Sequence, residues 1–377
     1  MGGAPPLLLH YMNIKHLESL VEQHGTPVLL VSRQRVREAY RTLKAALSGV
    51  DLYYAVKSNC LPVIISTLRE EGALFDVCTS GEIEIVKGCG VKADECLHTH
   101  PIKTDAEIRK ALDYGIDLFV ADNEHELDKL IPYKDRLKLL VRMSIQNPAA
   151  VVNLSHKFGV KPSETFALIW KAAQRGLHVE GISFHVGSQS ENSLKYMEAL
   201  EYCRDICRKS ALSGIPLRII DIGGGFPIRY LSGVMPTQQF CQPINEYLER
   251  YFSGYRIIAE PGRVLCGSSA VLAARVVGKS RRDGVWWYYL DEGVYGCFSG
   301  KMYDHAEYPM IIPRSGPVQT STIAGPTCDS IDVLYENIPL PALEIGDVLL
   351  FESMGAYTTA SASEFNGFPK AKVAAID

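Results

Sequence analysis

The chain lacks a regular cysteine pattern, a long basic run and an apolar run long enough to cross a bilayer. Its 10 cysteines are scattered without a Cys-x-x-Cys pair, so neither a disulfide framework nor a thiolate zinc site is expected. A formal net charge of −4 without basic clusters disfavours a nucleic-acid partner. The N-terminal stretch has no charged region of the kind that begins a signal peptide. These absences predict a cytoplasmic protein with no membrane or nucleic-acid partner and no metal.

The bulk composition is ordinary for a globular protein. Of the 377 residues, 47% are hydrophobic and 22% are charged, and both shares are usual for globular chains. A chain of this length has room for one large domain and a smaller one, with ample volume for a core.

Short β-branched runs alternate with amphipathic helical stretches from about residue 28 to residue 265. Strands are expected at residues 28–31, 52–56, 73–77, 95–98, 118–121, 137–143, 179–185, 218–222 and 256–259. Helices are expected at residues 33–47, 62–71, 81–88, 104–114, 123–130, 162–176, 191–213 and 237–252. Such alternation implies parallel pairing, in a closed (β/α)₈ barrel or in an open doubly wound sheet.

The barrel is favoured because residues that can carry chemistry end many different strands, whereas an open sheet would gather them near one switch point. In a barrel all strand ends face one mouth. The residues expected to converge there are Lys57, Asp76, Arg142, His185, Gly223 and Glu260.

The helical period fades after about residue 268, which predicts a second domain of a different class. Residues 270–279, 285–291, 320–324 and 347–351 are β-like, with Gly, Pro and Asp turns between them. The expected fold is therefore α/β, with a (β/α)₈ TIM-like barrel over residues 33–268. An all-β domain of the barrel or sandwich type is expected from residues 1–32 and 269–377.

Lys57 is the most informative single residue, because it follows the apolar run at residues 52–56 with little charge beside it. An amine at the carboxyl end of a strand can form a Schiff base with an aldehyde cofactor. Taken alone, Lys57 is more simply a surface lysine that follows a strand. The turns at the ends of later strands favour the first interpretation.

Three of those turns offer the groups that such a cofactor needs. Gly223-Gly224-Gly225 follows a strand and could bring backbone N–H groups to a phosphate, although a glycine turn alone is weak support. Arg263 could add a guanidinium to the same anion, or form a surface salt bridge. Glu260 closes an apolar strand, and a protonated pyridine nitrogen would pair with it. His185 could stack on a flat ring or be a hydrogen-bonded core residue.

A second group of candidates lies in the C-terminal region. It contains Tyr295, Tyr303-Asp304, Cys328-Asp329 and Tyr357. Cys328 could be an inert thiol or, beside Asp329 in a Gly-Pro loop, a proton donor. Tyr357 could be a core tyrosine or a phosphate ligand.

Three other patterns are assigned to structure. The two imidazoles of His98-Thr99-His100 are not expected to hold a metal, because no carboxylate pattern accompanies them. Cys203 and Cys207, on one helix face, are expected to be core thiols. The aromatic run 286–289 alternates across a strand and is expected to pack a sheet.

Taken together, the motifs resemble the barrel-type, fold type III pyridoxal-phosphate decarboxylases that act on ornithine, lysine, diaminopimelate or arginine, and most closely the ornithine branch. The resemblance covers nearly the whole chain. It is carried by residues 54–59, 184–188, 221–227, 259–263, 293–296, 325–329, 355–358 and 365–368.

The resemblance implies a role for each matching residue. Lys57 would carry pyridoxal 5'-phosphate, Glu260 would hold the pyridine nitrogen, and His185 would stack on the ring. Cys328 would protonate the carbon that loses carbon dioxide, and an ordinary thiol, mostly protonated at neutral pH, suits a donor. The phosphate would be bound by Ser188, Gly224, Gly225, Gly262, Arg263 and Tyr357. The remaining cofactor contacts implied are Asp76 and Arg142, with Glu82 near them. The substrate contacts implied are Tyr295, Asp304, Asp329 and Phe365.

The family also implies a homodimer with two shared active sites, in which Cys328 and Asp329 reach the partner's barrel mouth and Lys157 pairs with Asp332 across the interface. The expected reaction is conversion of L-ornithine to putrescine in polyamine biosynthesis, with L-lysine to cadaverine as a second activity.

Three alternatives stay open at this point. They are a decarboxylase of a modified ornithine or lysine, a diaminopimelate enzyme and a regulatory homologue without activity. Diaminopimelate is disfavoured because Ser299 stands where its enzymes typically have arginine, and because Asp329 stands where they have glutamate. Intact Lys57, Glu260 and Cys328 disfavour the inactive homologue, and Glu260 also disfavours a racemase, which would place arginine against the ring nitrogen.

Overall fold

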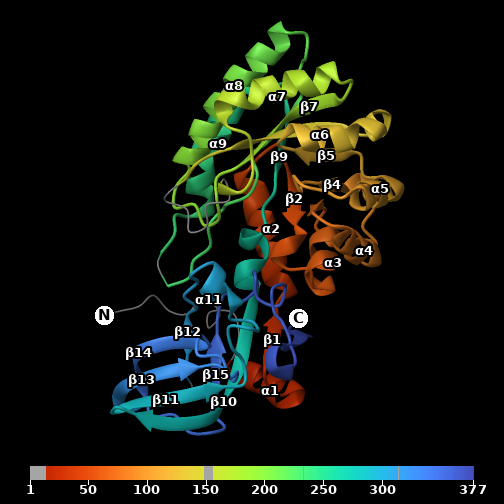
Figure 1. Cartoon of the computed structure of the whole chain (residues 1–377). Helices are drawn as coiled ribbons and strands as arrows, with labels where there is room; N and C mark the ends of the chain where they lie inside the picture. The colour runs from red at the N-terminus through yellow and green to blue at the C-terminus, as the bar shows by residue number, and fades with distance from the viewer. Residues whose placement is uncertain (1–13, 148–155, 232, 313) are drawn as a thin grey trace. The chain divides into compact units, whose positions relative to one another are not determined.

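The structure is a computed structural model that describes residues 14–147, 156–231, 233–312 and 314–377. The predicted first residues of the β-domain, 1–13, therefore lie outside the described part. The chain divides into two compact units (Figure 1). The barrel unit consists of Val36–Ile228 and Val234–Leu265, and the sheet unit contains the rest of the described chain.

The barrel unit is built on a closed barrel of parallel strands. Its strands are β2 (Val50–Ala55), β3 (Leu74–Val77), β4 (Cys96–His98), β5 (Leu118–Ala121), β6 (Lys138–Ser144), β7 (His178–His185), β8 (Ile219–Asp221) and β9 (Arg256–Ala259). Each pairs in parallel with the next, and β2 closes the ring on β9. The predicted (β/α)₈ barrel is confirmed.

Amphipathic helices alternate with these strands (Figure 1). They are α2 (Arg33–Ala46), α3 (Pro62–Glu70), α4 (Ser80–Gly88), α5 (Asp105–Tyr114), α6 (Glu124–Leu130), α7 (Pro162–Gln174), α8 (Leu194–Leu212) and α9 (Thr237–Tyr251). The side-chain oxygens of Thr79, Thr104 and Asn123 each accept a backbone N–H at the start of α4, α5 and α6. These caps fix where a helix begins after its strand.

The barrel interior explains why polar residues meet at one end. Tyr53, Leu97, Leu118, Val120, Leu140, Ile219 and Ile258 form a buried cluster contributed by six strands. Side chains two residues apart on a strand share a face. Asp221 and Glu260 stand two positions beyond Ile219 and Ile258, and Arg142 stands two beyond Leu140. The strand period therefore directs these polar side chains inward at the carboxyl end of the barrel.

The sheet unit contains an eight-stranded mixed sheet among its described residues. Its strands are β1 (Val28–Val31), β10 (Ala270–Arg282), β11 (Val285–Leu290), β12 (Met310–Ile311), β13 (Val318–Ala324), β14 (Val333–Pro341), β15 (Val348–Phe351) and β16 (Lys372–Ala375). β1 pairs with β10 and with β16 near the other end of the chain. The predicted second β-domain is confirmed as a sheet.

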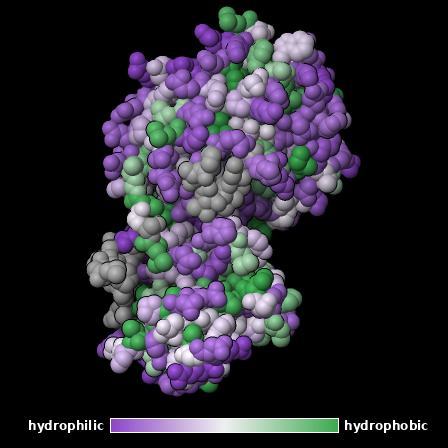
Figure 2. All heavy atoms as spheres, turned by 60° about the vertical axis from the view of Figure 1, so that its left-hand side comes forward, coloured by the Kyte–Doolittle hydropathy of each residue, from purple (hydrophilic) through white to green (hydrophobic). Residues whose placement is uncertain are grey.

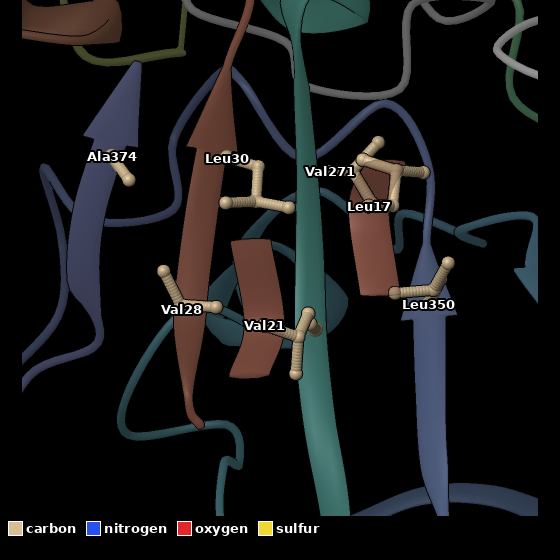
Figure 3. Packing of buried hydrophobic residues seen from close by; sticks show 8 residues of the cluster. Leu17, Val21, Val28, Leu30, Val271, Leu350 and Ala374 are labelled. Carbon is tan, nitrogen blue, oxygen red and sulfur yellow. The ribbon is translucent and has the colours of Figure 1, made fainter. Parts of the chain in front are cut away.

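Two helices make this unit less purely β than expected. They are α1 (Ile14–His24) and the short α11 (Ser299–Tyr303). Leu17 and Val21 of α1 belong to one buried cluster with Val28, Leu30 and Val271 of the sheet (Figure 3). α1 is thus held by its apolar stripe, as amphipathic helices on sheets are.

The visible surface of the barrel unit is mostly hydrophilic, with apolar side chains scattered among polar ones (Figure 2). No helix in the described ranges has both the length and the hydropathy that a membrane-crossing segment needs.

Candidate active site

Lys57 stands just past the end of β2. The strand ends at Ala55, and a single 3₁₀ turn over Val56–Ser58 carries the lysine. Ser58 Oγ donates to the Ala55 carbonyl at 2.8 Å, which closes this turn. The Lys57 side chain is 39% exposed, and its Nζ donates to Asp76 Oδ2 at 2.9 Å. The amine is therefore both accessible and paired with a carboxylate.

Asp76 lies on β3 and is fully buried. Its second oxygen, Oδ1, accepts a hydrogen bond from Thr99 Oγ1, at the end of the neighbouring β4. Cys78 Sγ lies 3.9 Å from Lys57 Nζ and 3.8 Å from Thr99 Oγ1. Burial raises the pKa of Cys78 to about 12, so its thiol is protonated at neutral pH. Glu82 Oε2 accepts from the Cys78 backbone N–H at 2.6 Å and fixes this loop.

Glu260 follows β9 and is buried. Burial raises the pKa of Glu260, the negative Asp76 raises it further, and the cations Lys57 and Arg142 oppose both effects. Burial and the neighbouring Glu260 carboxylate raise the pKa of Asp221 well above its ordinary range. Asp221 is therefore the member of this acid pair that keeps its proton when Glu260 is charged.

His185 ends β7 with a neutral ring. Burial lowers the pKa of His185 well below its ordinary value, and the cations Arg142 and Lys57 act in the same direction. Its Nδ1 accepts the backbone N–H of Gly187 at 3.0 Å, so Nδ1 carries no proton. A Cβ added to Gly224 would lie 3.1 Å from His185 Nε2. The glycine turn thus packs closely beside this flat, uncharged ring.

The glycine turn after β8 is held by the residues around it. Gly223 has φ +66° and Gly225 has φ +114°, and a Cβ on Gly225 would come within 2.4 Å of the Gly187 carbonyl. Only glycine fits this backbone. The Tyr196 hydroxyl donates to the Gly224 carbonyl at 2.8 Å, which leaves the turn rigid.

A cation and a hydroxyl lie beside the loops at this end of the barrel. Arg263 follows Gly262 and is buried, and its guanidinium donates to Ser188 Oγ at 3.1 Å. A Cβ on Gly262 would lie 3.0 Å from the Ser58 Cβ, in the turn that carries Lys57. Small residues, a guanidinium and a hydroxyl are the groups that cradle a phosphate.

These donors fit pyridoxal phosphate. The group needs an amine for its aldehyde, an acid for its ring nitrogen, a flat neighbour for its ring and donors for its phosphate. Lys57, Glu260, His185 and the pair Ser188 and Arg263 offer these four functions within the barrel unit.

The sheet unit gathers a different set, around an ionised carboxylate. The Tyr295 hydroxyl donates to Asp329 Oδ2, and this hydrogen bond lowers the pKa of Asp329. The Tyr295 ring stacks on Phe365 with centroids 4.2 Å apart. The exposed Cys328 is held by its backbone N–H, which donates to Asn366 Oδ1 at 3.1 Å. The structure thus brings Tyr295, Cys328, Asp329 and Phe365 together.

Asp304 and Tyr357 are associated with the two ends of α11. Asp304 caps the carboxyl end of the helix, and its backbone N–H donates to the Gly300 carbonyl at 2.9 Å. Ser299, at the other end, donates its hydroxyl to the Tyr357 carbonyl at 3.3 Å. Tyr357 itself has φ +54°, a strained value for a residue with a Cβ.

Asp332 holds the loop that carries Asp329. Its Oδ1 accepts from Val294 N at 2.8 Å, and its Oδ2 accepts from the backbone N–H and the hydroxyl of Thr327. The Lys157 ammonium lies 5.0 Å from the centre of the Phe158 ring. Pairing of Lys157 with Asp332 across a dimer interface stays a prediction.

Two residues at the Lys57 cluster were not found from the sequence, namely Cys78 and Thr99. Thr99 stands two positions beyond the inward-facing Leu97, and this period was the available signal. The predicted structural roles of other residues are confirmed. His98 is buried and stacks on Phe119 at 5.4 Å, Cys203 and Cys207 are buried, and Trp286 stacks on Tyr288 along β11. Among the described residues no group of His, Cys, Asp or Glu is placed to hold a metal ion.

Known proteins resemble this chain over most of its length. Residues 33–267 match the family model for the pyridoxal binding domain of pyridoxal-dependent decarboxylases. The lysine/ornithine decarboxylase of Selenomonas ruminantium is 39% identical over 355 residues, which cover 94% of this chain and 90% of the relative. The ornithine decarboxylase of Mus musculus is 35% identical over 359 residues, or 90% and 77% of the two chains.

A solved structure is similar as well. The crystal structure of the lysine/ornithine decarboxylase of Vibrio vulnificus, complexed with cadaverine, matches with a TM-score of 0.92 and 46% identity. The match covers 96% of this chain and 98% of that one.

Proposed function

Because the chain belongs to the pyridoxal-dependent decarboxylase family, we propose that it decarboxylates L-ornithine by preference and L-lysine as a second substrate. It is a pyridoxal phosphate-dependent decarboxylase of the ornithine and lysine type. The preferred amino acid, the role of each residue and the shared dimeric site are the proposal.

The observation that carries the substrate proposal is the ionised Asp329 carboxylate, oriented by the Tyr295 hydroxyl beside the Phe365 ring. A fixed carboxylate next to an apolar ring suits a terminal ammonium on a methylene chain. Asp304 supplies a second negative charge. Ornithine and lysine differ by one methylene, which a pocket distinguishes by only about 1–3 kcal/mol. A ranking of the two, with both accepted, is the expected outcome.

When bound, pyridoxal phosphate supplies an aldehyde for amine attachment and a ring that takes up the electron pair left by carbon dioxide. Lys57 would hold the cofactor through its ε-amine until a substrate amine takes that place, and Asp76 would hydrogen-bond the freed lysine side chain. Glu260 keeps a proton on the ring nitrogen. His185, neutral at working pH, gives the ring an uncharged stacking surface.

Other residues bind the phosphate and supply the proton that replaces carbon dioxide on the substrate. Arg263 and Ser188 bind the phosphate, with backbone N–H groups of Gly224, Gly225 and Gly262 and the hydroxyl of Tyr357. Arg142 helps to keep Glu260 ionised, since its charge lowers the pKa of Glu260. The Cys328 thiol returns a proton to the carbon from which carbon dioxide has left.

We assign the working form to a homodimer in which the loop of one copy, with Cys328 and Asp329, completes the barrel mouth of the other. Exposed apolar side chains accompany this loop. Tyr303 is 70% exposed, Ile331 48% and Phe365 40%. Such side chains are typical of a surface that a second copy covers.

A carbon dioxide release assay tests the substrate proposal. The purified enzyme is given L-ornithine, L-lysine, diaminopimelate and L-arginine at equal concentration, and kcat/KM is compared. We expect L-ornithine first and L-lysine second, within about 10–200-fold of each other, the range for one methylene. Diaminopimelate turned over as fast as L-ornithine would refute the role given to Asp329.

The proton-donor role of Cys328 predicts a change in product. In Cys328→Ala, carbon dioxide is still released, but part of the substrate would leave as an aldehyde. The proton would go to a carbon of the cofactor instead of the substrate carbon that lost carbon dioxide, and hydrolysis would then leave the amino group on the cofactor. The rate of diamine formation is expected to fall about 10²-fold or more, the range for a positioned proton donor. Mass spectrometry of the products gives the ratio of aldehyde to diamine.

The matched control is Cys89→Ala, at the end of helix α4, which should keep the normal product ratio. Full diamine yield from Cys328→Ala would show that another group delivers the proton.

A further inference from the structure

The amine of Lys57 is part of a hydrogen-bonded series with two further members. Lys57 Nζ donates to one oxygen of Asp76 at 2.9 Å, and the Thr99 hydroxyl donates to the other. Asp76 is 0% exposed and Thr99 is 2% exposed, so water does not replace either bond. We propose that Thr99 is a positioning residue that shares the negative charge of Asp76 and thereby keeps Lys57 reactive. This proposal rests on the attachment role of Lys57 proposed above.

The geometry leaves the Thr99 hydroxyl one proton to donate, and it goes to Asp76 Oδ1. Cys78 Sγ, 3.8 Å away, faces the same hydroxyl from the loop after β3. Thr99 also donates its backbone N–H to the Val77 carbonyl at 3.2 Å, which ties the start of its loop to β3. The threonine is thus fixed at both its backbone and its side chain.

The loop beyond Thr99 is anchored by a buried ion pair. Lys103 Nζ lies 3.4 Å from Glu126 Oε1 and donates to the carbonyls of His100 and Val120 at 2.9 and 2.7 Å. Both side chains of the pair are 1% exposed. A buried pair of this kind fixes one arrangement, because breaking it would strand a charge. The ion pair therefore holds the loop, and with it the Thr99 hydroxyl, in place beside Asp76.

A carboxylate with a hydrogen-bond donor on each oxygen attracts an ammonium less strongly than one with a single donor. Without the threonine hydroxyl, the buried Asp76 charge would depend on Lys57 alone, and Lys57 would keep its proton to higher pH. A protonated amine cannot attack an aldehyde. The hydroxyl thus favours the neutral amine that attachment requires.

Other titratable groups face this cluster, and they are the same in the wild-type and variant proteins. These titratable or charged groups are Glu82 on α4, Glu260 after β9, Asp221 on β8, Arg142 on β6, the neutral His185 on β7, and His98 and His100 on and after β4. None of them bonds to Asp76 Oδ1 in place of Thr99. Their effect on the Lys57 midpoint is therefore the same in both proteins and cancels when the two midpoints are compared.

The test compares the full-length wild type with Thr99→Val, which keeps the shape and removes the hydroxyl. After the cofactor has been removed with hydroxylamine and the fold checked by circular dichroism, Lys57 is acetylated by brief pulses of acetic anhydride at a series of pH values. Peptide mass spectrometry gives the modified fraction of Lys57. We expect the midpoint of the pH profile to rise by about 0.5–1 unit in Thr99→Val, part of the strength of a hydrogen bond to a charged group.

The holoenzyme supplies a second measurement. We expect kcat to fall about tenfold in Thr99→Val with KM little changed, and Thr99→Ser to restore both kcat and the acetylation midpoint. Thr165→Val is the matched control, since Thr165 is equally buried but donates only to the Lys161 carbonyl of its own helix. It should leave the Lys57 midpoint where it is in the wild type.

An unchanged or lowered midpoint in Thr99→Val would overturn the proposal, and Thr99→Ala gives the same comparison if the valine variant does not fold. The role of Lys57 itself is judged separately. Absence of a borohydride-reduced cofactor adduct on the Lys57 peptide of the wild type would refute the attachment role, whatever the midpoints are.

Discussion

A Lys57→Ala variant is expected to lose its reducible cofactor adduct and at least about 10³-fold in kcat/KM, the size of effect that covalent attachment and proton transfer supply together. Lys57 offers an amine that is 39% exposed on one side and bonded to Asp76 at 2.9 Å on the other. Alanine removes the nucleophile and also strands the buried Asp76 carboxylate. Both losses act on cofactor attachment before any substrate binds.

Two measurements follow the loss. Borohydride reduction and peptide mass spectrometry should find the pyridoxyl mass on the Lys57 peptide of the wild type and nowhere in the variant. Carbon dioxide release from L-ornithine gives kcat/KM. The matched control is Lys138→Ala, whose ammonium pairs with Asp117 at 2.8 Å at the start of β6, the opposite end of the barrel. An adduct on another lysine with wild-type activity would refute the assignment.

Much of the barrel could be predicted because its strands are short apolar runs with polar residues at their ends. The prediction failed at particular boundaries. Residues 218–222 were expected as one strand, but β8 is only Ile219–Asp221, since the chain must turn at Gly223 with φ +66°. The expected strand 52–56 ends one residue early, because Val56 begins the 3₁₀ turn that carries Lys57.

The sheet unit was harder to predict, because its strands do not all alternate cleanly. β14 (Val333–Pro341) was missed, since it contains two prolines and an asparagine with φ +54°. Prolines are usually kept from central strands, and β14 is an edge strand of its sheet. Helix α1 was missed too, although its apolar stripe with Leu17 and Val21 is in the sequence, because residues 1–32 were assigned as a whole to the β-domain.

The candidate site also contains residues that could be predicted from the sequence and residues that were missed. Ionisable residues at strand ends, such as Glu260 and His185, could be found because strand ends meet at one mouth. Thr99 was not identified, although it stands two positions beyond the inward-facing Leu97, because its side chain carries no ionisable group that would mark it as a candidate. Its contact with Asp76 joins positions 23 residues apart and depends on the pairing of β3 with β4.

Glu260→Gln is expected to lower kcat by about 10²–10³-fold while the cofactor adduct on Lys57 is retained. The reason is that a neutral amide cannot hold a proton on the ring nitrogen, and the loss of one preorganised electrostatic partner costs about this much. Volume is conserved, so folding should be little affected. The adduct is expected to be lost in Lys57→Ala and kept in Glu260→Gln. This difference distinguishes a residue that attaches the cofactor from one that helps the ring to take up electrons.

The acid pair makes the glutamine variant more informative. With Glu260 neutral, Asp221 loses the neighbouring charge that helps to raise its pKa, and that pKa is expected to fall. Burial, the larger cause, remains in place and keeps that pKa raised, so Asp221 is expected to be a poor replacement for the lost carboxylate. The double variant Glu260→Gln with Asp221→Asn should therefore be no slower than Glu260→Gln by more than a few fold.

The measurements are kcat for L-ornithine and the visible absorbance of the bound cofactor, with Glu180→Gln as the matched control. Glu180 is an acid of the same size near the start of β7, where it contacts His178 at 3.0 Å, whereas His185 ends the same strand. Near-wild-type kcat in Glu260→Gln would show that the ring nitrogen needs no carboxylate. A further large loss in the double variant would show that Asp221 carries the charge instead, because a residue that stays protonated has no charge to lose.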